Sequence, residues 1–286
     1  MFHELQIFEN PEAILLVASI IFFFSIIAGK AGFRFGLPAL LLFLGVGMLF
    51  GSDGLGIQFS NPSAAQFIGM LALSIILFSG GMDTKMSEIK PIATEGVVLA
   101  TVGVLLTTLI TGGFIYYVFL WSTGYETLTV AESMLMAAVM SSTDSASVFS
   151  ILRSKGVYLK QRLRPTLELE SGSNDPMAYM LTLLIIAYIQ VGGMNLQEAV
   201  LQLLVQLSVG AIAGFLLGKL AVLMINKINM DNESLYPILL LTTAFFTFSA
   251  TTLCKGNGYL AVYIAGLVVG NAKIVHKKSM GTFFDG

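Results

Sequence analysis

Residues 170–176 of this 286-residue chain read Glu-Ser-Gly-Ser-Asn-Asp-Pro. Two carboxylates, one amide and two hydroxyls therefore stand inside an apolar segment that is long enough to cross a lipid bilayer. In the preceding apolar segment, residues 141–144 read Ser-Ser-Thr-Asp. An acidic side chain at bilayer depth costs at least ~2.5–3.5 kcal/mol on insertion scales, so an intramembrane acid indicates a functional site. Two acids on consecutive segments predict a path for a cation or a proton.

The composition predicts an all-α, polytopic membrane protein. Hydrophobic residues make up 56% of the chain and charged residues only 11%, whereas a soluble domain carries about 25% charged residues. The net charge of -2 is too small to indicate a nucleic-acid partner. The single cysteine, Cys254, excludes an internal disulfide and a multi-cysteine metal site, and no cofactor is expected. Residues 1–12 contain no Lys or Arg, so the first apolar segment is expected to be a retained span.

Apolar stretches of roughly 20 residues predict about nine transmembrane helices, in one membrane domain over residues 1–286 without a soluble domain. The predicted spans are 12–29, 37–51, 63–82, 94–120, 130–152, 165–190, 198–225, 235–253 and 258–274.

Lys and Arg residues predict the orientation of these spans, because short cytoplasmic connections carry an excess of them. Fourteen of the fifteen basic residues fall on the side that follows the odd-numbered spans, and only Lys255 falls on the other. The fourteen are Lys30, Arg34, Lys85, Lys90, Arg153, Lys155, Lys160, Arg162, Arg164, Lys219, Lys227, Lys273, Lys277 and Lys278. We therefore expect a multi-pass protein of the cell (inner or plasma) membrane, with the N-terminus outside and residue 286 in the cytoplasm.

Glycines spaced four residues apart predict close contacts between helices, because small residues let helix backbones approach within the membrane. They are Gly210, Gly214 and Gly218 in the seventh span and Gly266 and Gly270 in the ninth. These stripes are expected to serve packing within the bundle, or a dimer face, rather than ligand binding.

The 170–176 segment can present oxygen ligands on one side of a helix. Glu170 lies four residues before Asn174, and Ser171 lies four residues before Asp175, so each pair shares a helix face. Pro176 cannot donate a backbone hydrogen bond and is expected to leave a carbonyl near residue 172 without its usual donor. Carboxylate, hydroxyl, amide and carbonyl oxygens suit hard cations.

The polar run 141–144 predicts a break in the fifth helix, where backbone carbonyls can face a cavity. A partly desolvated carboxylate on the neighbouring helix could hold either a proton or a cation near neutral pH. Mutual exclusion at one carboxylate is sufficient for exchange if the site opens alternately to each side. For both Asp144 and Asp175, a structural acid paired within the bundle is the alternative interpretation.

The two polar segments resemble the core of the monovalent cation:proton antiporters, in the NhaP branch. Residues 147–156 and 165–168 are similar to the bacterial potassium/proton antiporters of that branch, and residues 258–271 resemble a later span of the family. The resemblance covers essentially the whole chain. It implies exchange of K⁺ or Na⁺ for H⁺ by a homodimer in a lipid bilayer, with no chemical bond changed, and therefore no enzyme activity.

The resemblance also implies roles for individual residues. Asp175 would be the shared proton and cation site, and Thr143, Ser171 and Glu170 would help to bind the ion. Asn174 and Asp144 would organise the site, Asn174 at the unwound region and Asp144 as the acid of the helix break. Members with Asn-Asp at residues 174–175, where relatives have Asp-Asp, are generally electroneutral, so electroneutral exchange is expected.

One departure from the family concerns length. The family has about thirteen spans built as inverted repeats that cross at the site. The chain supplies about nine of them and ends in a stretch, residues 282–286, that resembles a short loop before the next span. We therefore expect the sequence to be the N-terminal part of this fold, truncated at its C-terminal end, and unable to transport alone.

Two other functions fit paired intramembrane acids. A cation channel or a non-transporting membrane sensor would also use polar groups at this depth. An intramembrane aspartyl protease would need Gly-x-Gly-Asp and Tyr-Asp motifs, and the sequence contains neither.

Overall fold

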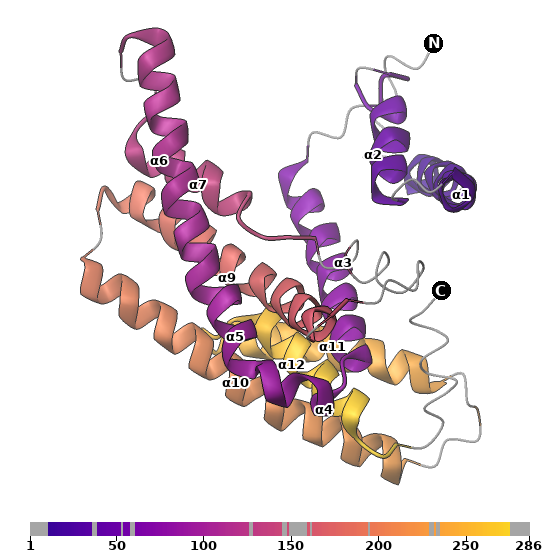
Figure 1. Ribbon diagram of the computed structural model, residues 1–286. Coiled ribbons are helices and arrows are strands. Elements are labelled where there is room, and N and C mark those ends of the chain that lie inside the picture. The colour runs from indigo at the N-terminus through magenta and orange to yellow at the C-terminus, as the bar shows by residue number, and fades with distance from the viewer. Residues whose placement is uncertain are drawn as a thin grey trace. The chain divides into compact units, whose positions relative to one another are not determined.

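The computed structural model describes residues 11–274 except residues 36–38, 53, 58–60, 126–127, 145–147, 149–158, 161, 194, 229–231 and 233–234. All the regular elements in these described residues are helical (Figure 1). They are α1 (Pro11–Phe35), α2 (Ala39–Phe50), α3 (Pro62–Asp83), α4 (Met86–Ile89), the 3₁₀ turn η2 (Lys90–Ile92), α5 (Ala93–Val98), the π turn η3 (Leu99–Gly103), α6 (Val104–Thr123), α7 (Val130–Val139), α9 (Leu163–Val191), α10 (Leu196–Lys227), α11 (Leu235–Leu253) and α12 (Gly258–Asn271).

Each predicted span overlaps a helix, in order α1, α2, α3, α5 to α6, α7, α9, α10, α11 and α12. The fifth span, predicted over 130–152, is helical in α7 only as far as Val139, and residues 141–144 are non-helical. Five stretches of the described chain are long and apolar enough to cross a membrane, and α2, α7 and α12 are shorter apolar helices. The fourth span starts earlier than predicted, because the helical stretch runs from Met86 to Thr123 through a 3₁₀ turn and a π turn. The expected all-α, polytopic architecture is therefore confirmed.

The chain divides into two compact units, residues 1–68 and residues 69–286. Within the first unit, α1 and α2 pack through aromatic residues. The rings of Phe24 and Phe50 lie 5.7 Å apart, and a Cβ at Gly29 would lie 3.4 Å from the ring of Phe43.

In the second unit, α12 packs closely against two other helices. On one side, the α10 glycines meet the α12 backbone: a Cβ at Gly210 would lie 2.8 Å from the carbonyl oxygen of Asn257, and one at Gly218 would lie 3.0 Å from Cα of Ala265. On the other side, Gly266 leaves no room for a Cβ against the backbone of Phe78 in α3. The predicted packing role of both glycine stripes is confirmed, and the stripes face partners within the chain rather than a dimer interface.

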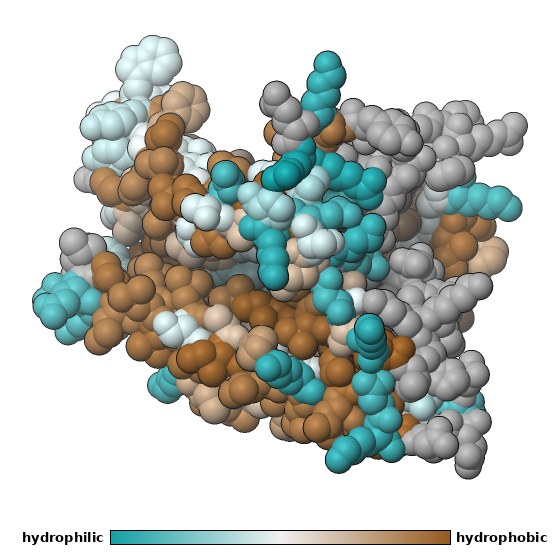
Figure 2. Space-filling model, turned by 60° about the horizontal axis from the view of Figure 1, so that its bottom comes forward, coloured by the Kyte–Doolittle hydropathy of each residue, from teal (hydrophilic) through white to brown (hydrophobic). Residues whose placement is uncertain are grey.

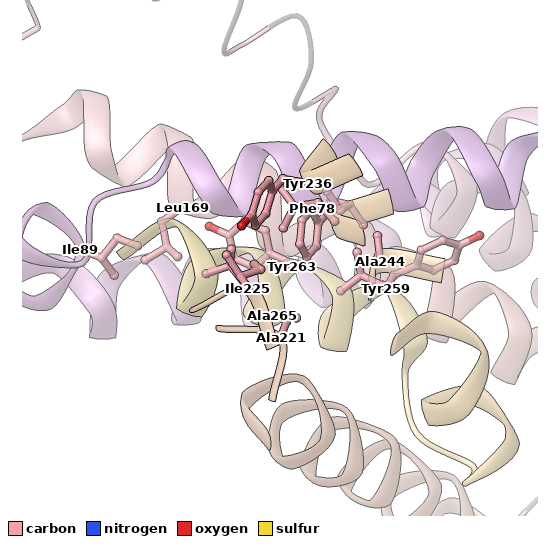
Figure 3. Close-up of a cluster of buried hydrophobic side chains, with 14 of the residues drawn as sticks. Phe78, Ile89, Leu169, Ala221, Ile225, Tyr236, Ala244, Tyr259, Tyr263 and Ala265 are labelled. Carbon is pink, nitrogen blue, oxygen red and sulfur yellow. The ribbon is translucent and has the colours of Figure 1, made fainter. Parts of the chain in front are cut away.

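A hydrophobic core fills the space around α12. Figure 3 shows Phe78 of α3, Tyr236 of α11 and Tyr263 of α12 in this cluster, and all three are buried. Ala221 of α10 and Ala265 of α12 are small enough to let these helices cross closely. The core thus joins α3, α10, α11 and α12, and it reaches α9 through Leu169.

Large apolar side chains also cover much of the outside of this unit. Leu204, Ile212 and Leu216 of α10 are each more than half exposed. Figure 2 shows hydrophobic residues over most of the face that α10 occupies. A soluble monomer rarely exposes so large an apolar surface, so this face suits lipid.

Several predicted features lie outside the described residues. They are the parts of the fifth span at 145–147 and 149–152, the basic residues Arg153, Lys155, Lys277 and Lys278, and the C-terminal stretch 282–286.

Candidate functional site

The helix break predicted at residues 141–144 is present. Helix α7 begins at a capping box formed by Thr129 and Glu132, and it ends at Val139. The hydroxyl of Ser141 donates to the carbonyl oxygen of Ala138 at 2.7 Å, and the Ser141 amide reaches the same oxygen at 3.2 Å. Short polar side chains that bond nearby backbone groups compete with the helical pattern, and here they end the helix. Residues 141–144 are therefore non-helical.

Helix α9, by contrast, runs without interruption through Pro176. A proline removes one backbone hydrogen bond, and neighbouring helices can compensate for that loss in a membrane protein. Met177, Ala178 and Leu181 of α9 pack with Val104 and Ala138 in a second buried cluster. The expected disturbance at Pro176 thus leaves the helix continuous.

The non-helical segment that follows α7, residues 141–144, contacts α9 through hydroxyl, carboxylate and amide groups. The hydroxyl oxygens of Thr143 and Ser171 lie 3.0 Å apart. Thr143 and Ser171 both approach Oε2 of Glu170, at 3.5 Å and 3.2 Å. Nδ2 of Asn174 donates to Oγ1 of Thr143 at 2.7 Å and to Oε1 of Glu170 at 2.9 Å. We call Thr143, Glu170, Ser171 and Asn174 the polar seam.

Asn174 connects the members of the polar seam. Its side chain is fully buried, and both hydrogens of its amide nitrogen can be used by Thr143 and Glu170. No hydrogen-bond donor among the described residues reaches its Oδ1. The Asn174 amide nitrogen therefore holds Thr143, in the segment after α7, against α9. Its Oδ1 remains as a buried hydrogen-bond acceptor.

The two predicted acids lie at different exposures. Asp144 directly follows Thr143 in the non-helical segment and is exposed, while Asp175 on α9 is half-buried. At about 100° per residue, Asp175 lies about 40° around α9 from Ser171. The structure thus brings Thr143, Glu170, Ser171 and Asn174 into direct contact and places Asp175 at the edge of the same helix face.

One buried side chain near α9 was not predicted from the sequence. Tyr263 of α12 packs over Gly172, where a Cβ would come within 2.8 Å of its ring. Gly172 is thus small because an aromatic ring of another helix covers it. The four-residue spacing of Gly266 and Gly270 indicated close packing of α12 but not which helix its tyrosines face.

The polar seam offers hydroxyl and carboxylate oxygens, with no thiol or imidazole among its members. Across the described residues, no group of three or more His, Cys, Asp or Glu side chains could hold a metal ion. The hydroxyl and carboxylate oxygens of the polar seam suit a hard, weakly held cation better than a transition metal.

Comparisons with known proteins identify the family of the chain. The family described as "Sodium/hydrogen exchanger, transmembrane" matches residues 12–284. The K(+)/H(+) antiporter NhaP of Alkalimonas amylolytica is 38% identical over 267 residues, which cover 93% of this chain and 45% of that protein. The K(+)/H(+) antiporter NhaP2 of Shewanella sp. (strain ANA-3) is 35% identical over 281 residues, 97% of this chain and 47% of that protein. The chain therefore spans about half the length of the curated relatives it matches.

Solved structures show the same fold. The sodium proton antiporter MjNhaP1 from Methanocaldococcus jannaschii, solved at pH 8, matches with a TM-score of 0.74 and 24% identity. That match covers 95% of this chain and 66% of the antiporter chain. Because the family match extends over nearly the whole sequence and the helices superpose on an antiporter, the chain belongs to the sodium/hydrogen exchanger family, whose members are transporters rather than enzymes.

Proposed function

We propose that this protein exchanges a monovalent cation, K⁺ or Na⁺, for H⁺ across a membrane, and that the exchange is electroneutral. The observation that carries the proposal is the polar seam, in which the non-helical end of α7 places Thr143 3.0 Å from Ser171 on α9. The family and the names of the relatives point to the same activity.

Asp175 is the group that holds either the proton or the cation in this proposal. Its half-buried position allows contact with water while it lowers the number of competing water ligands. Thr143, Ser171 and Glu170 supply further oxygens for the cation, and Asn174 holds them in place. Asp144 is the acid of the helix break. A cation that binds at Asp175 displaces the proton, so one carboxylate couples the two fluxes.

The surrounding assembly follows from the same proposal. The protein spans the cell membrane several times, with the N-terminus outside and residue 286 in the cytoplasm, as the distribution of Lys and Arg predicts. It acts as a homodimer and needs no cofactor.

The test is exchange by the native full-length protein, called the native protein below, in inside-out membrane vesicles, followed with a quenched pH dye. Pulses of KCl or NaCl are expected to dequench the dye with the native protein. With Asp175→Asn the dequenching is expected to disappear, because the amide can hold neither a proton nor a cation by charge.

The matched control is Asp83→Asn, the same chemical change at an exposed residue that ends α3. The control is expected to keep exchange near the native rate. Undiminished exchange by Asp175→Asn at native expression would overturn the assignment of Asp175, and steady currents without pH coupling would favour a channel.

A further inference from the structure

Asn257 is a buried amide, 3% exposed, that touches three helices at one end of α12. Its Oδ1 accepts from the backbone amide of Leu260 at 3.0 Å and so caps α12. Its Nδ2 donates to the carbonyl oxygen of Pro176 in α9 at 2.8 Å. Its backbone amide donates to the carbonyl oxygen of Gln206 in α10 at 3.0 Å. One residue thus links α9 and α12 through its side chain and α10 through its backbone.

The turn before α12 holds Asn257 in a fixed place. Lys255 adopts a left-handed backbone with φ of 63°, and the amide of Gly256 donates to the carbonyl of Thr251 at 2.9 Å. A left-handed residue with such a bond is typical of a tight helix end. Gly210 of α10 also packs directly on the Asn257 carbonyl. The tight turn after α11 and the contact with Gly210 therefore hold the backbone of Asn257 in a defined position.

The carbonyl that Asn257 binds belongs to the residue after Asp175. Pro176 lacks an amide hydrogen, so the turn of α9 that contains Asp175 has one backbone bond fewer than a regular helix. The bond from Asn257 supplies an outside contact at this weakened turn. It fixes the height and rotation of that turn relative to α10 and α12.

Around the axis of α9, Asp175 lies between the face that contacts α12 and the face that carries the polar seam. Residues 172, 176 and 179 lie within about 60° of one another around the helix. All three contact α12: Gly172 lies under Tyr263, Pro176 accepts from Asn257, and the Tyr179 ring meets that of Tyr259 at 4.8 Å. Asp175 lies about 40° from this face and about 40° from Ser171 in the polar seam. A rotation of α9 away from α12 would therefore move Asp175, together with Ser171 and Asn174, relative to Thr143, the member of the polar seam that lies outside α9.

Two other asparagines show that this contact is not a general feature of helix ends. Asn195 also caps its helix, α10, by accepting from Gln197, but it is exposed. Asn271 at the other end of α12 donates to the carbonyl of Thr84 and accepts from the amide of Met86, so it links α12 to the α3–α4 turn. Of the three, Asn257 bonds the turn that carries the exchange carboxylate.

We propose that Asn257 is a positioning residue for cation exchange: its amide holds the Asp175 turn of α9 at the correct place against the α10–α12 frame. This inference rests on the proposed function. Asn257 acts through α9 and does not itself bind the ion.

The decisive variant is Asn257→Ser in the native protein. A serine still caps α12, since Ser and Asn are equally good at the N-cap, but it is too short to reach Pro176. The KM for KCl or NaCl in the vesicle assay is expected to rise about fivefold, as for loss of one buried hydrogen bond, while the maximal rate stays near native. The thermal midpoint of the purified protein is expected to stay close to native, because the cap remains.

Asn257→Ala removes both the cap and the contact with α9. It is expected to match the serine variant in KM but to unfold at a lower temperature. The matched control Asn195→Ser keeps a cap at an exposed helix end and is expected to keep native KM and thermal midpoint.

A native KM in Asn257→Ser, with exchange present in the native protein, overturns the positioning role and leaves the proposed function intact. A KM that rises only together with a lower thermal midpoint also overturns it, because that result marks a purely structural residue. Absence of exchange in the native protein would instead overturn the proposed function.

Discussion

The polar seam and the contact between α10 and α12 join helices in opposite ways. In the polar seam, two hydroxyls, a carboxylate and an amide meet at 2.7–3.5 Å across a non-helical segment. Between α10 and α12, backbones touch with almost no side chain between them, at Gly210, Gly214 and Gly218. We call these three glycines and the α12 residues that they meet the glycine seam.

The difference shows how a membrane protein can combine a rigid frame with an adjustable site. Lipid provides no hydrophobic force between helices, so close packing of small residues supplies much of the association. Such packing has one good geometry and resists change. Hydrogen bonds between hydroxyls and a carboxylate can exchange partners with an ion or water at little cost in packing. The glycine seam therefore keeps the helices in place, and the polar seam provides the groups that can bind an ion.

The largest expected effect comes from breaking the glycine seam with Gly214→Val. A Cβ at this position would lie 2.8 Å from Cα of Ala261, and the atom cannot move aside because it is backbone. The free energy of unfolding is expected to fall by about 3 kcal/mol, the upper end of the usual cost of overpacking. Thermal unfolding in detergent, followed by light scattering, is expected to show this loss as a lower midpoint temperature.

Gly113→Val in α6 is the matched control, because a Cβ there has no neighbour within 4 Å in the described chain. It is expected to unfold near the native temperature. Equal losses in the two valine variants would show that helix propensity, and not the glycine seam, sets the stability at these positions.

The second-largest effect is expected in the polar seam, where it tests whether the hydroxyls of Thr143 and Ser171 bind the same cation. Thr143→Val and Ser171→Ala each remove a hydroxyl from the pair that lies 3.0 Å apart. If both hydroxyls bind the same ion, the KM for the cation is expected to rise about fivefold to tenfold in either variant. The double variant is expected to cost less than the sum of the two, because residues in contact are coupled by about 1 kcal/mol. Strict additivity would indicate that the two hydroxyls act separately.

The smallest effect is expected outside both seams, at the ion pair between Lys85 and Glu88. Their charged atoms lie 3.2 Å apart, but the side chains are 72% and 46% exposed. Exposed pairs contribute little, so Glu88→Gln is expected to lower the free energy of unfolding by less than about 0.5 kcal/mol. The same thermal unfolding assay checks it, and a loss as large as that of Gly214→Val would contradict the ranking.

The sequence predicted the spans because hydrophobicity and length decide which segments can cross a bilayer. The eighth span, 235–253, coincides with α11, and the sixth, 165–190, lies within two residues of the ends of α9. The break after α7 was predicted from Ser141 to Asp144, because four polar groups in an apolar run favour local bonds. The glycine stripes were likewise visible as a spacing.

The structure differs from the sequence prediction where a residue's effect depends on its neighbours. Pro176 was expected to leave a carbonyl near residue 172 without its usual donor, and the structure adds what surrounds that turn: α9 stays helical, Met177 and Leu181 pack in a buried cluster, and Asn257 donates to the Pro176 carbonyl. The glycine stripe of α10 could have served a dimer face, and it faces α12 instead. Spacing along one helix does not identify the helix on the other side.

By itself, the sequence determined the class of the protein, its spans, the polar segments 141–144 and 170–176, and the family that they resemble, because all of these follow from local composition and order. Tertiary structure alone decided which groups meet. It placed Thr143 against Ser171 and Asn174, and it placed Asn257, 81 residues from Pro176, on the turn that carries Asp175. The physical reason is that hydrogen bonds and backbone contacts act over a few ångströms in space, and the fold decides which distant residues come that close.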